Sequence, residues 1–287
     1  MTAESLTVGG TARKRRGARE ARKAVEGGIQ VVFLLCGTLA VGFVLLISIY
    51  LILSGLPAIR QIGLVDFLFG RVWDPTNATT GAKFGILPFI LTSIYGTAGA
   101  VVLGVPVGLL TAVYLAKIAP PKVAVAIRTA VQLLAGIPSV VYGLVGMIVL
   151  AIMILPSIIN VAENALRAVP KEYEEASLAL GATKLETYFK VTLPAAGSGV
   201  AAAIVLGVGR AIGEAMAIIM VSGNVSNMPS IFAPVRFLTT GIVSGMGYAR
   251  VGSLYHQALF SIGLVLFLFI MLINVLLNVL IKKKGDA

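Results

Sequence analysis

The sequence GGIQVVFLLCGTLAVGFVLLISIYLILSGLPAI, from Gly27 to Ile59, contains no charged side chain. Three more uncharged runs follow, at 84–116, 129–162 and 251–281. A transmembrane helix needs about 20 consecutive apolar residues, so each run is long enough to cross a bilayer. Only 12% of the 287 residues are charged, whereas a soluble domain carries about 25%. The pattern excludes a water-soluble protein and predicts an all-α, polytopic membrane protein.

The formal net charge of +11 comes mainly from basic residues that cluster between the apolar runs. Most lie in the first 26 residues, in the polar gaps at 117–128 and 167–190, and at 282–284. Cytoplasmic loops collect Lys and Arg, so these regions and both termini are expected on the cytoplasmic side of the cell membrane. The stretches 55–83 and 223–250 are expected outside. The charge therefore follows topology rather than nucleic-acid binding, and membrane lipid is the expected contact.

The runs predict six spans. These are Ile29–Leu53, Ile86–Ala116, two within 129–162, Ala195–Val221 and Leu254–Ile281. Two crossings within 129–162 have about 17 residues each, the lower limit for a transmembrane helix, and one long helix is the alternative. We expect residues 1–26 to be disordered and Trp73 to lie at a membrane–water boundary. Gly104-x-x-x-Gly108 predicts a close helix contact.

Residues 170–194 carry the local signals of two short helices joined by a glycine. Pro170 suits the first turn of a helix. This helix is expected over Lys171–Leu180 and should end at Gly181, the usual residue for a left-handed cap. Thr183-Lys184-Leu185-Glu186 matches the capping box that begins a second helix. Spacing alone leaves open whether the segment is an ordinary loop or a docking element.

The order Glu175-Ala176-Ser177, three residues, Gly181, nine residues, Val191, one residue, Leu193-Pro194 resembles the EAA loop of binding-protein-dependent ABC importer permeases. Ser177 stands in place of alanine and Val191 in place of isoleucine. In that family the loop docks in a groove of the ATP-hydrolysing subunit. The resemblance therefore implies a type-1 ABC importer permease and a dimeric ATP-binding partner. The docking residues that it implies are Glu175, Ala176, Gly181, Leu193 and Pro194.

Motifs for chemistry within the chain itself were not found. No G-x-x-x-x-G-K-[ST] sequence occurs, so ATP and Mg²⁺ are expected to be used by the partner ATPase, with no cofactor bound here. Cys36 and His256 are the single cysteine and histidine, which is too few for a metal site. We therefore expect a protein that is not an enzyme, with ATP hydrolysis in a separate subunit.

Arg210 and Glu214 are the only charged residues between Lys190 and Arg236. A span that begins near Ala195 places Arg210 about 22 Å along it, near the middle of the bilayer. An arginine at that depth costs at least about 2.5–3.5 kcal/mol. The spacing of four predicts that Glu214 lies on the same helix face as its counter-ion. Either the pair is structural and holds two helices together, or the guanidinium receives an anion.

The sequence around this pair, Gly207-Val-Gly-Arg-Ala-Ile-Gly-Glu-Ala-Met216 with Gly223-Asn224, resembles the phosphate-importer permeases. So does Leu134-Ala-Gly-Ile-Pro-Ser-Val-Val-Tyr-Gly143. The resemblance covers about residues 60–281 and implies that Arg210 and Glu214 act in phosphate passage. Ser139 follows a proline that either offers a helix N-terminus to an anion or only kinks the helix. The chain departs from the family in lacking an outer connection between Leu150 and Ala151.

These features predict the permease subunit of an ATP-driven importer of inorganic phosphate. Its expected parts are a basic tail at 1–26, a first helix and outer segment at 27–84, a permease core at 85–281 and a basic end at 282–287. The expected partners are a homologous second permease, the ATP-binding subunit and an external phosphate-binding protein. The alternatives are a permease for sulfate, molybdate or another small oxyanion, a secondary transporter or channel, and a membrane scaffold.

Overall fold

The computed structural model describes residues 4–77, 79, 81–136, 146–230 and 233–285. The chain divides into two compact units, Met1–Leu53 and Ser54–Ala287. Helix α1 (Glu4–Ile62) begins in the first unit and ends in the second. The expectation of a disordered tail is therefore wrong, because α1 already begins at Glu4. The tail is rich in Ala, Arg and Lys, which are good helix formers.

Among the described residues, four helices are long and apolar enough to cross a membrane. They are Glu26–Ile62, Leu87–Ile118, Met147–Arg167 and Leu254–Leu277, and a bent pair, Lys184–Ala195 with Gly197–Gly213, is a fifth candidate. This confirms an all-α polytopic fold, with four or five candidate spans where six were expected. Of the two spans expected within 129–162, the described residues contain one helix long and apolar enough to cross, Met147–Arg167, and residues 137–145 lie outside the description.

Helix α4 (Pro121–Gly136) occupies the start of the first of these two expected crossings. It begins before residue 129 and carries Arg128, whose Nη2 lies 2.6 Å from Oε1 of Glu163. The segment that connects α4 to the next helix lies outside the described residues.

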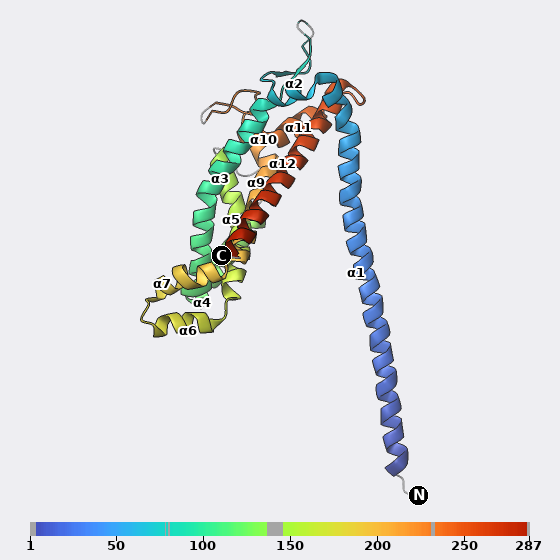
Figure 1. Cartoon of the computed structure of the whole chain (residues 1–287), viewed down its shortest axis with the longest axis vertical. Helices are drawn as coiled ribbons and strands as arrows, with labels where there is room; N and C mark the ends of the chain where they lie inside the picture. The colour runs from blue at the N-terminus through green and yellow to red at the C-terminus, as the bar shows by residue number, and fades with distance from the viewer. Residues whose placement is uncertain (1–3, 78, 80, 137–145, 231–232, 286–287) are drawn as a thin grey trace. The chain divides into compact units, whose positions relative to one another are not determined.

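In the second unit, α3 (Leu87–Val113), α5 (Gly146–Arg167), α9 (Gly197–Gly213) and α12 (Leu254–Gly285) form a bundle (Figure 1). Glycines allow close packing. A Cβ on Gly104 would lie 2.7 Å from Cδ1 of Ile154, and one on Gly108 would lie 2.8 Å from Cγ2 of Ile158. A Cβ on Gly207 of α9 would lie 2.8 Å from Cγ1 of the same Ile158. The predicted close contact is confirmed, and α5 is the partner helix.

One end of the bundle, here called the α2 end, carries α2, a β-hairpin, α10 and α11 (Figure 1). Their bounds are α2 Leu64–Phe69, β1 Trp73–Asp74, β2 Lys83–Phe84, α10 Met216–Val221 and α11 Leu238–Met246. Trp73 was expected at a membrane–water boundary, but it is buried. Because the hairpin folds back over the bundle, the Trp73 ring lies 5.4 Å from that of Phe89 and 6.1 Å from that of Tyr255.

The opposite end, here called the α6 end, carries α4, α6 (Lys171–Ala179) and α7 (Lys184–Thr187) (Figure 1). Here α3 ends in a π-helical turn, η1 (Tyr114–Ile118). The chain continues from α7 through a second π-helical turn, η3 (Tyr188–Thr192), into α8 (Leu193–Ala195). It then bends by 75° before α9 begins.

Candidate functional site

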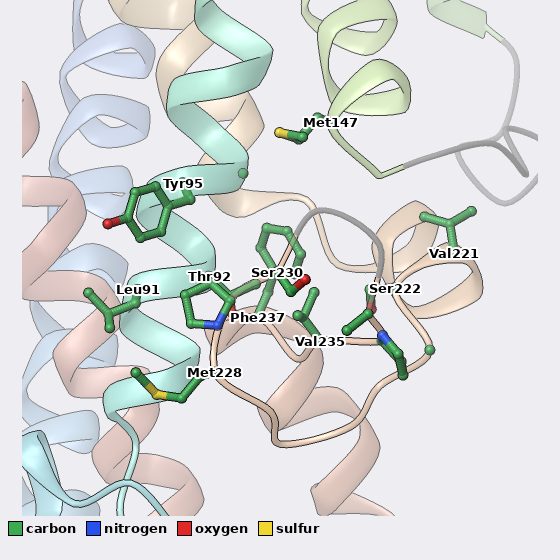
Figure 2. Close-up of a pocket in the computed structure, with 15 residues that line it drawn as sticks. Leu91, Thr92, Tyr95, Met147, Val221, Ser222, Met228, Ser230, Val235 and Phe237 are labelled. Carbon is green, nitrogen blue, oxygen red and sulfur yellow. The ribbon is translucent and has the colours of Figure 1, made fainter.

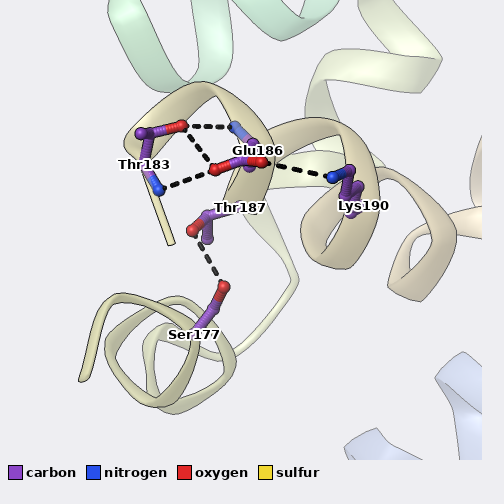
Figure 3. Close-up of polar contacts among 5 residues, drawn as sticks. All are labelled: Ser177, Thr183, Glu186, Thr187 and Lys190. Carbon is purple, nitrogen blue, oxygen red and sulfur yellow. Dashed lines mark hydrogen bonds and ion pairs between the residues drawn. The ribbon is translucent and has the colours of Figure 1, made fainter. Parts of the chain in front are cut away.

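Residues 170–194, here called the docking loop, fold locally as predicted. Helix α6 is followed by Gly181, which has a left-handed backbone with φ 88°. The hydroxyl of Thr183 accepts the backbone N–H of Glu186 (3.3 Å), and a carboxylate oxygen of Glu186 accepts the backbone N–H of Thr183 (3.1 Å) (Figure 3). The predicted glycine end and capping box are both confirmed.

Ser177, which replaces an alanine of the family pattern, links the two helices of the docking loop. Its Oγ points toward Thr187 and lies 2.9 Å from Oγ1 of that residue (Figure 3). An alanine could not make this bond. On the surface, Lys190 pairs with Glu186 at 3.2 Å. The backbone and hydroxyl hydrogen bonds from Thr183, then Lys190, hold the pKa of Glu186 below its usual range.

The predicted docking residues occupy two positions. Glu175, Ala176 and Gly181 are exposed on α6 and at its end. Leu193 is half-buried and packs against the core of the α6 end, and Pro194 is exposed one residue later, just before the bend. The first three are open to a partner, whereas Leu193 anchors the docking loop to the bundle.

Arg210 lies in the last turn of α9 with its side chain exposed, but it forms no ion pair with Glu214. Helix α9 ends at Gly213, and Glu214 has an extended backbone with ψ 125°. Its Oε1 accepts the backbone N–H of Ala217 (3.0 Å), and its carbonyl accepts Oγ1 of Thr239 (2.8 Å). The prediction of one helix over 195–221 with both charges on one face is therefore wrong, because the backbone breaks between them.

The neighbour of Arg210 is Ser157 of α5, whose Oγ lies 3.5 Å from Nη1 in a long contact. The sequence reasoning missed Ser157, although a polar residue after Pro156 in an apolar run gave a usable signal. The same proline–serine pattern pointed to Ser139, which lies outside the described residues.

The three glycines near Arg210 have different surroundings. Gly207 packs against α5, whereas a Cβ on Gly209 or Gly213 would meet nothing within 4 Å. The expected room beside the arginine is therefore present at two of the three positions. A ligand or a further helix can approach Arg210 on that side.

A cavity of about 870 Å³ lies near the α2 end, between α3 and the segment 221–237 (Figure 2). Two hydroxyls that line it, Thr92 Oγ1 and Ser222 Oγ, have no hydrogen-bond partner within the described part of the chain. Both residues are buried, with exposed fractions of 3% and 7%. Phe237 also lines the cavity, and Thr239 two residues later binds Glu214. The start of α11 thus connects the cavity to the backbone break.

Arg236, the next cation along the chain, is held differently. Its Nε donates to Oδ1 of Asn224 (2.9 Å), its Nη2 donates to the carbonyl of the same residue (2.6 Å), and its Cζ lies 5.7 Å from the ring centroid of Phe89. Desolvation lowers the pKa of Arg236 from its usual value. Arg236 therefore serves the local structure, whereas Arg210 keeps most of its donors open.

Comparison with known proteins found a matching family model and several relatives. The family model described as binding-protein-dependent transport system inner membrane component matches residues 104–284. The probable ABC transporter permease protein YqgH of Bacillus subtilis is 35% identical, over 90% of this chain and 93% of its own length. The phosphate transport system permease protein PstC of Pasteurella multocida is 31% identical, over 76% and 81%. PstC 1 of Mycobacterium tuberculosis is also 31% identical, over 81% and 86%.

Among solved structures, a permease chain of the inward-facing MetNI methionine ABC transporter is similar, with a TM-score of 0.55 and 20% identity. The similarity covers 69% of this chain and 97% of that one. It confirms the fold of a type-1 ABC importer permease.

Proposed function

Because this chain belongs to the family of binding-protein-dependent transport system inner membrane components, we propose that it is the permease subunit of an ATP-driven importer of inorganic phosphate. The observation that carries the proposal is Arg210, an exposed guanidinium at the end of an apolar helix, beside a backbone break. In the described residues it has no acidic partner. The phosphate transport named for several relatives supports the choice of substrate.

The chemistry of the break suits an oxyanion. A guanidinium offers several N–H donors in a planar fork that matches the oxygens of phosphate. Among the described residues, Arg210 donates a single long contact, to Ser157, and the open space at Gly209 and Gly213 gives an anion access to the other donors. The carboxylate of Glu214 is directed to a backbone N–H instead. In this proposal its nearby negative charge limits how long the anion stays bound.

The cavity near the α2 end is the proposed approach to Arg210. Its lining includes no charged side chain among the described residues, and its buried hydroxyls at Thr92 and Ser222 have open donors. These donors suit the oxygens of a phosphate ion, which carry negative charge. Ser139 remains a candidate contact for the anion.

The α6 end is proposed to face the cytoplasm, with both chain termini, and to bind a dimeric ATP-binding subunit. Leu180, at the tip of the docking loop, is 89% exposed, and Glu175 is exposed on the same helix. An apolar side chain at the tip of a rigid loop suits a groove on a partner. The partner would bind ATP and Mg²⁺ and hydrolyse the ATP, while this chain provides the passage.

Two further protein partners complete the proposed importer. A homologous second permease would cover the exposed face of α9, where Leu206 and Arg210 lie. An external phosphate-binding protein would deliver the anion at the α2 end. Membrane lipid would surround the remaining apolar helices.

The test is uptake by proteoliposomes that contain the complete complex, with the binding protein added outside. We expect radiolabelled phosphate to accumulate in the vesicles only when ATP is enclosed inside them, on the cytoplasmic side of the complex. Excess sulfate or molybdate should not compete. Competition by either ion at equal concentration would instead assign a different oxyanion, and accumulation without ATP would assign a secondary transporter.

A further inference from the structure

The π-helical turn at the end of α3, η1, is a junction for the α6 end. The turn closes with a hydrogen bond from the backbone N–H of Ala119 to the carbonyl of Tyr114 (2.8 Å). Such turns are rare and are often found at functional sites. In this one, the carbonyls of Leu115 and Lys117 and the ammonium of Lys117 all bind neighbouring elements.

The ammonium of Lys117 forms an ion pair with Glu174 of α6, with Nζ 2.5 Å from Oε1. The two side chains are only 12% and 18% exposed. Oγ1 of Thr192, a fully buried residue, also donates to Oε1 of Glu174 (3.3 Å). Because the pair is largely removed from water, loss of one partner leaves a buried charge unpaired. Removing one partner should therefore cost more here than at the exposed pair of Lys190 and Glu186.

The backbone of the same turn is held from two other directions. Tyr188 of η3 donates its hydroxyl to the carbonyl of Lys117 (3.3 Å). Arg167 of α5 donates Nη2 to the carbonyl of Leu115 (2.7 Å), and its Nε binds the buried Glu163 (2.9 Å). Residues 115–117 thus join both halves of the docking loop to α3 and α5.

We propose that Lys117 and Glu174 are positioning residues that fasten the docking loop to α3, so that movement of the loop reaches the helices beside Arg210. The inference rests on the proposed function, which supplies the ATP-binding subunit that moves the loop. Helix α3 packs along α5, and Ser157 lies ten residues before Arg167, or about 15 Å at 1.5 Å per residue. The connection from the docking surface to Arg210 is therefore continuous through packed elements.

Two adjacent glutamates of α6 have different roles in this proposal. Glu174 precedes the EAA-like pattern and turns inward to Lys117, whereas Glu175 is exposed. Removing the charge of Glu174 should loosen the loop and leave the outer docking surface unchanged. Removing the charge of Glu175 should instead alter the surface that the partner contacts.

The experiment uses the complete complex with Lys117→Met, Glu174→Gln and the exchange Lys117→Glu/Glu174→Lys. Lys122→Met is the matched control, since it removes an exposed lysine of α4 that lies outside the docking loop. The readouts are co-purification of the ATP-binding subunit, ATP hydrolysis and uptake of radiolabelled inorganic phosphate. We expect both single variants to keep the ATP-binding subunit but to lose phosphate moved per ATP by about tenfold, a usual size for coupling between sites. The exchange should recover most of this loss, and the control should match the parent.

A second readout does not depend on the substrate. Leu110 of α3 and Leu178 of α6 are exposed and can be replaced by cysteines that carry spin labels, in a chain whose own exposed Cys36 is changed to serine. The labels report the distance between α3 and the docking loop. We expect one narrow distance in the parent and a broader distribution in Lys117→Met.

Three results would overturn the inference. The first is an unchanged spin-label distance together with an unchanged amount of phosphate moved per ATP in both single variants. The second is loss of the ATP-binding subunit from these variants. The third is an exchange variant that moves no more phosphate per ATP than either single variant. If the parent complex takes up no phosphate, the proposed substrate fails, while the distance measurement still decides whether Lys117 fastens the loop.

Discussion

The docking loop and the backbone break at Glu214 take their internal shape from different kinds of contact. In the loop, Thr183 and Glu186 bind each other across three residues, and Ser177 reaches Thr187 across ten. At the break, Glu214 is held by Thr239, 25 residues away, and Arg210 contacts Ser157, 53 residues away. The loop is thus a local structure presented to a partner, whereas the break depends on the packing of several helices.

This difference predicts that assembly and passage can be separated by mutation. Changes at the exposed docking residues and at the glycine turn of the loop should alter binding of the ATP-binding subunit. Changes at the break should alter phosphate uptake in a complex that is still assembled. Two measurements, co-purification of that subunit and uptake normalised to assembled complex, distinguish the two regions.

The largest effect is expected for Arg210→Gln. In the assembled importer the proposed second permease would cover Arg210. Losing one partner of a desolvated charge contact costs about 2–5 kcal/mol, so uptake should fall at least about thirtyfold. The ATP-binding subunit should still co-purify, because the docking loop is unchanged. The control is Arg236→Gln, which removes an arginine that serves the local structure and should reduce the yield of folded complex instead. Normal uptake by Arg210→Gln would remove this residue from the pathway.

Gly181→Val should weaken binding of the ATP-binding subunit and leave the backbone break at Glu214 unchanged. Its φ of 88° is strained for a residue with a β-branched side chain, while a Cβ there meets nothing within 4 Å. The left-handed backbone costs about 1–2 kcal/mol for residues other than glycine, so co-purification should fall about tenfold. Gly181→Asn is the control, since asparagine tolerates this conformation. Equal co-purification by the two variants and the parent would argue against the docking role.

Glu214→Gln should have a smaller effect, of a different kind. Glutamine can still accept the backbone N–H of Ala217, so the break should persist without its negative charge. We expect phosphate to be retained longer and uptake to fall about tenfold, as one desolvated charge interaction is lost. Glu214→Ala, which removes the acceptor as well, should also destabilise the complex. A loss of assembly in Glu214→Gln itself would make this charge structural.

The smallest effect is expected for Ser157→Ala. Its contact with Arg210 is long, at 3.5 Å, and a weak hydrogen bond is worth about 0.5 kcal/mol, or a factor of about two in uptake. Ser198→Ala, on the same apolar bundle but distant in sequence from the break, is the control. A fall as large as that of Arg210→Gln would show that Ser157 itself binds the anion.

The sequence predicts the docking loop better than the break because the contacts that shape the loop are close in sequence and those at the break are not. Proline, a left-handed glycine and a capping box act within a few residues, so the pattern at 170–194 determines the loop. The end of α9 has no such local signal, because Glu214 could equally continue a helix. The contacts that stop it come from Thr239 and Ala217, and only folding brings the first of these near.

Hydropathy alone predicted the membrane class and most of the long helices. It did not predict that Trp73 is buried, because burial there depends on a hairpin folding back over the bundle. It also treated Lys117 as a marker of topology, whereas this lysine is mostly buried against Glu174. Charge counting cannot distinguish a solvated lysine from a paired one, since the partner lies 57 residues farther along the chain.

The central claim is that the guanidinium of Arg210 contacts the transported anion. The most direct measurement is radiolabelled phosphate uptake by Arg210→Lys, normalised to assembled complex and compared with the parent. Lysine keeps the positive charge but lacks the planar fork of donors. We expect clearly reduced uptake with the ATP-binding subunit still bound. Uptake equal to that of the parent would show that charge alone suffices and would contradict the claim.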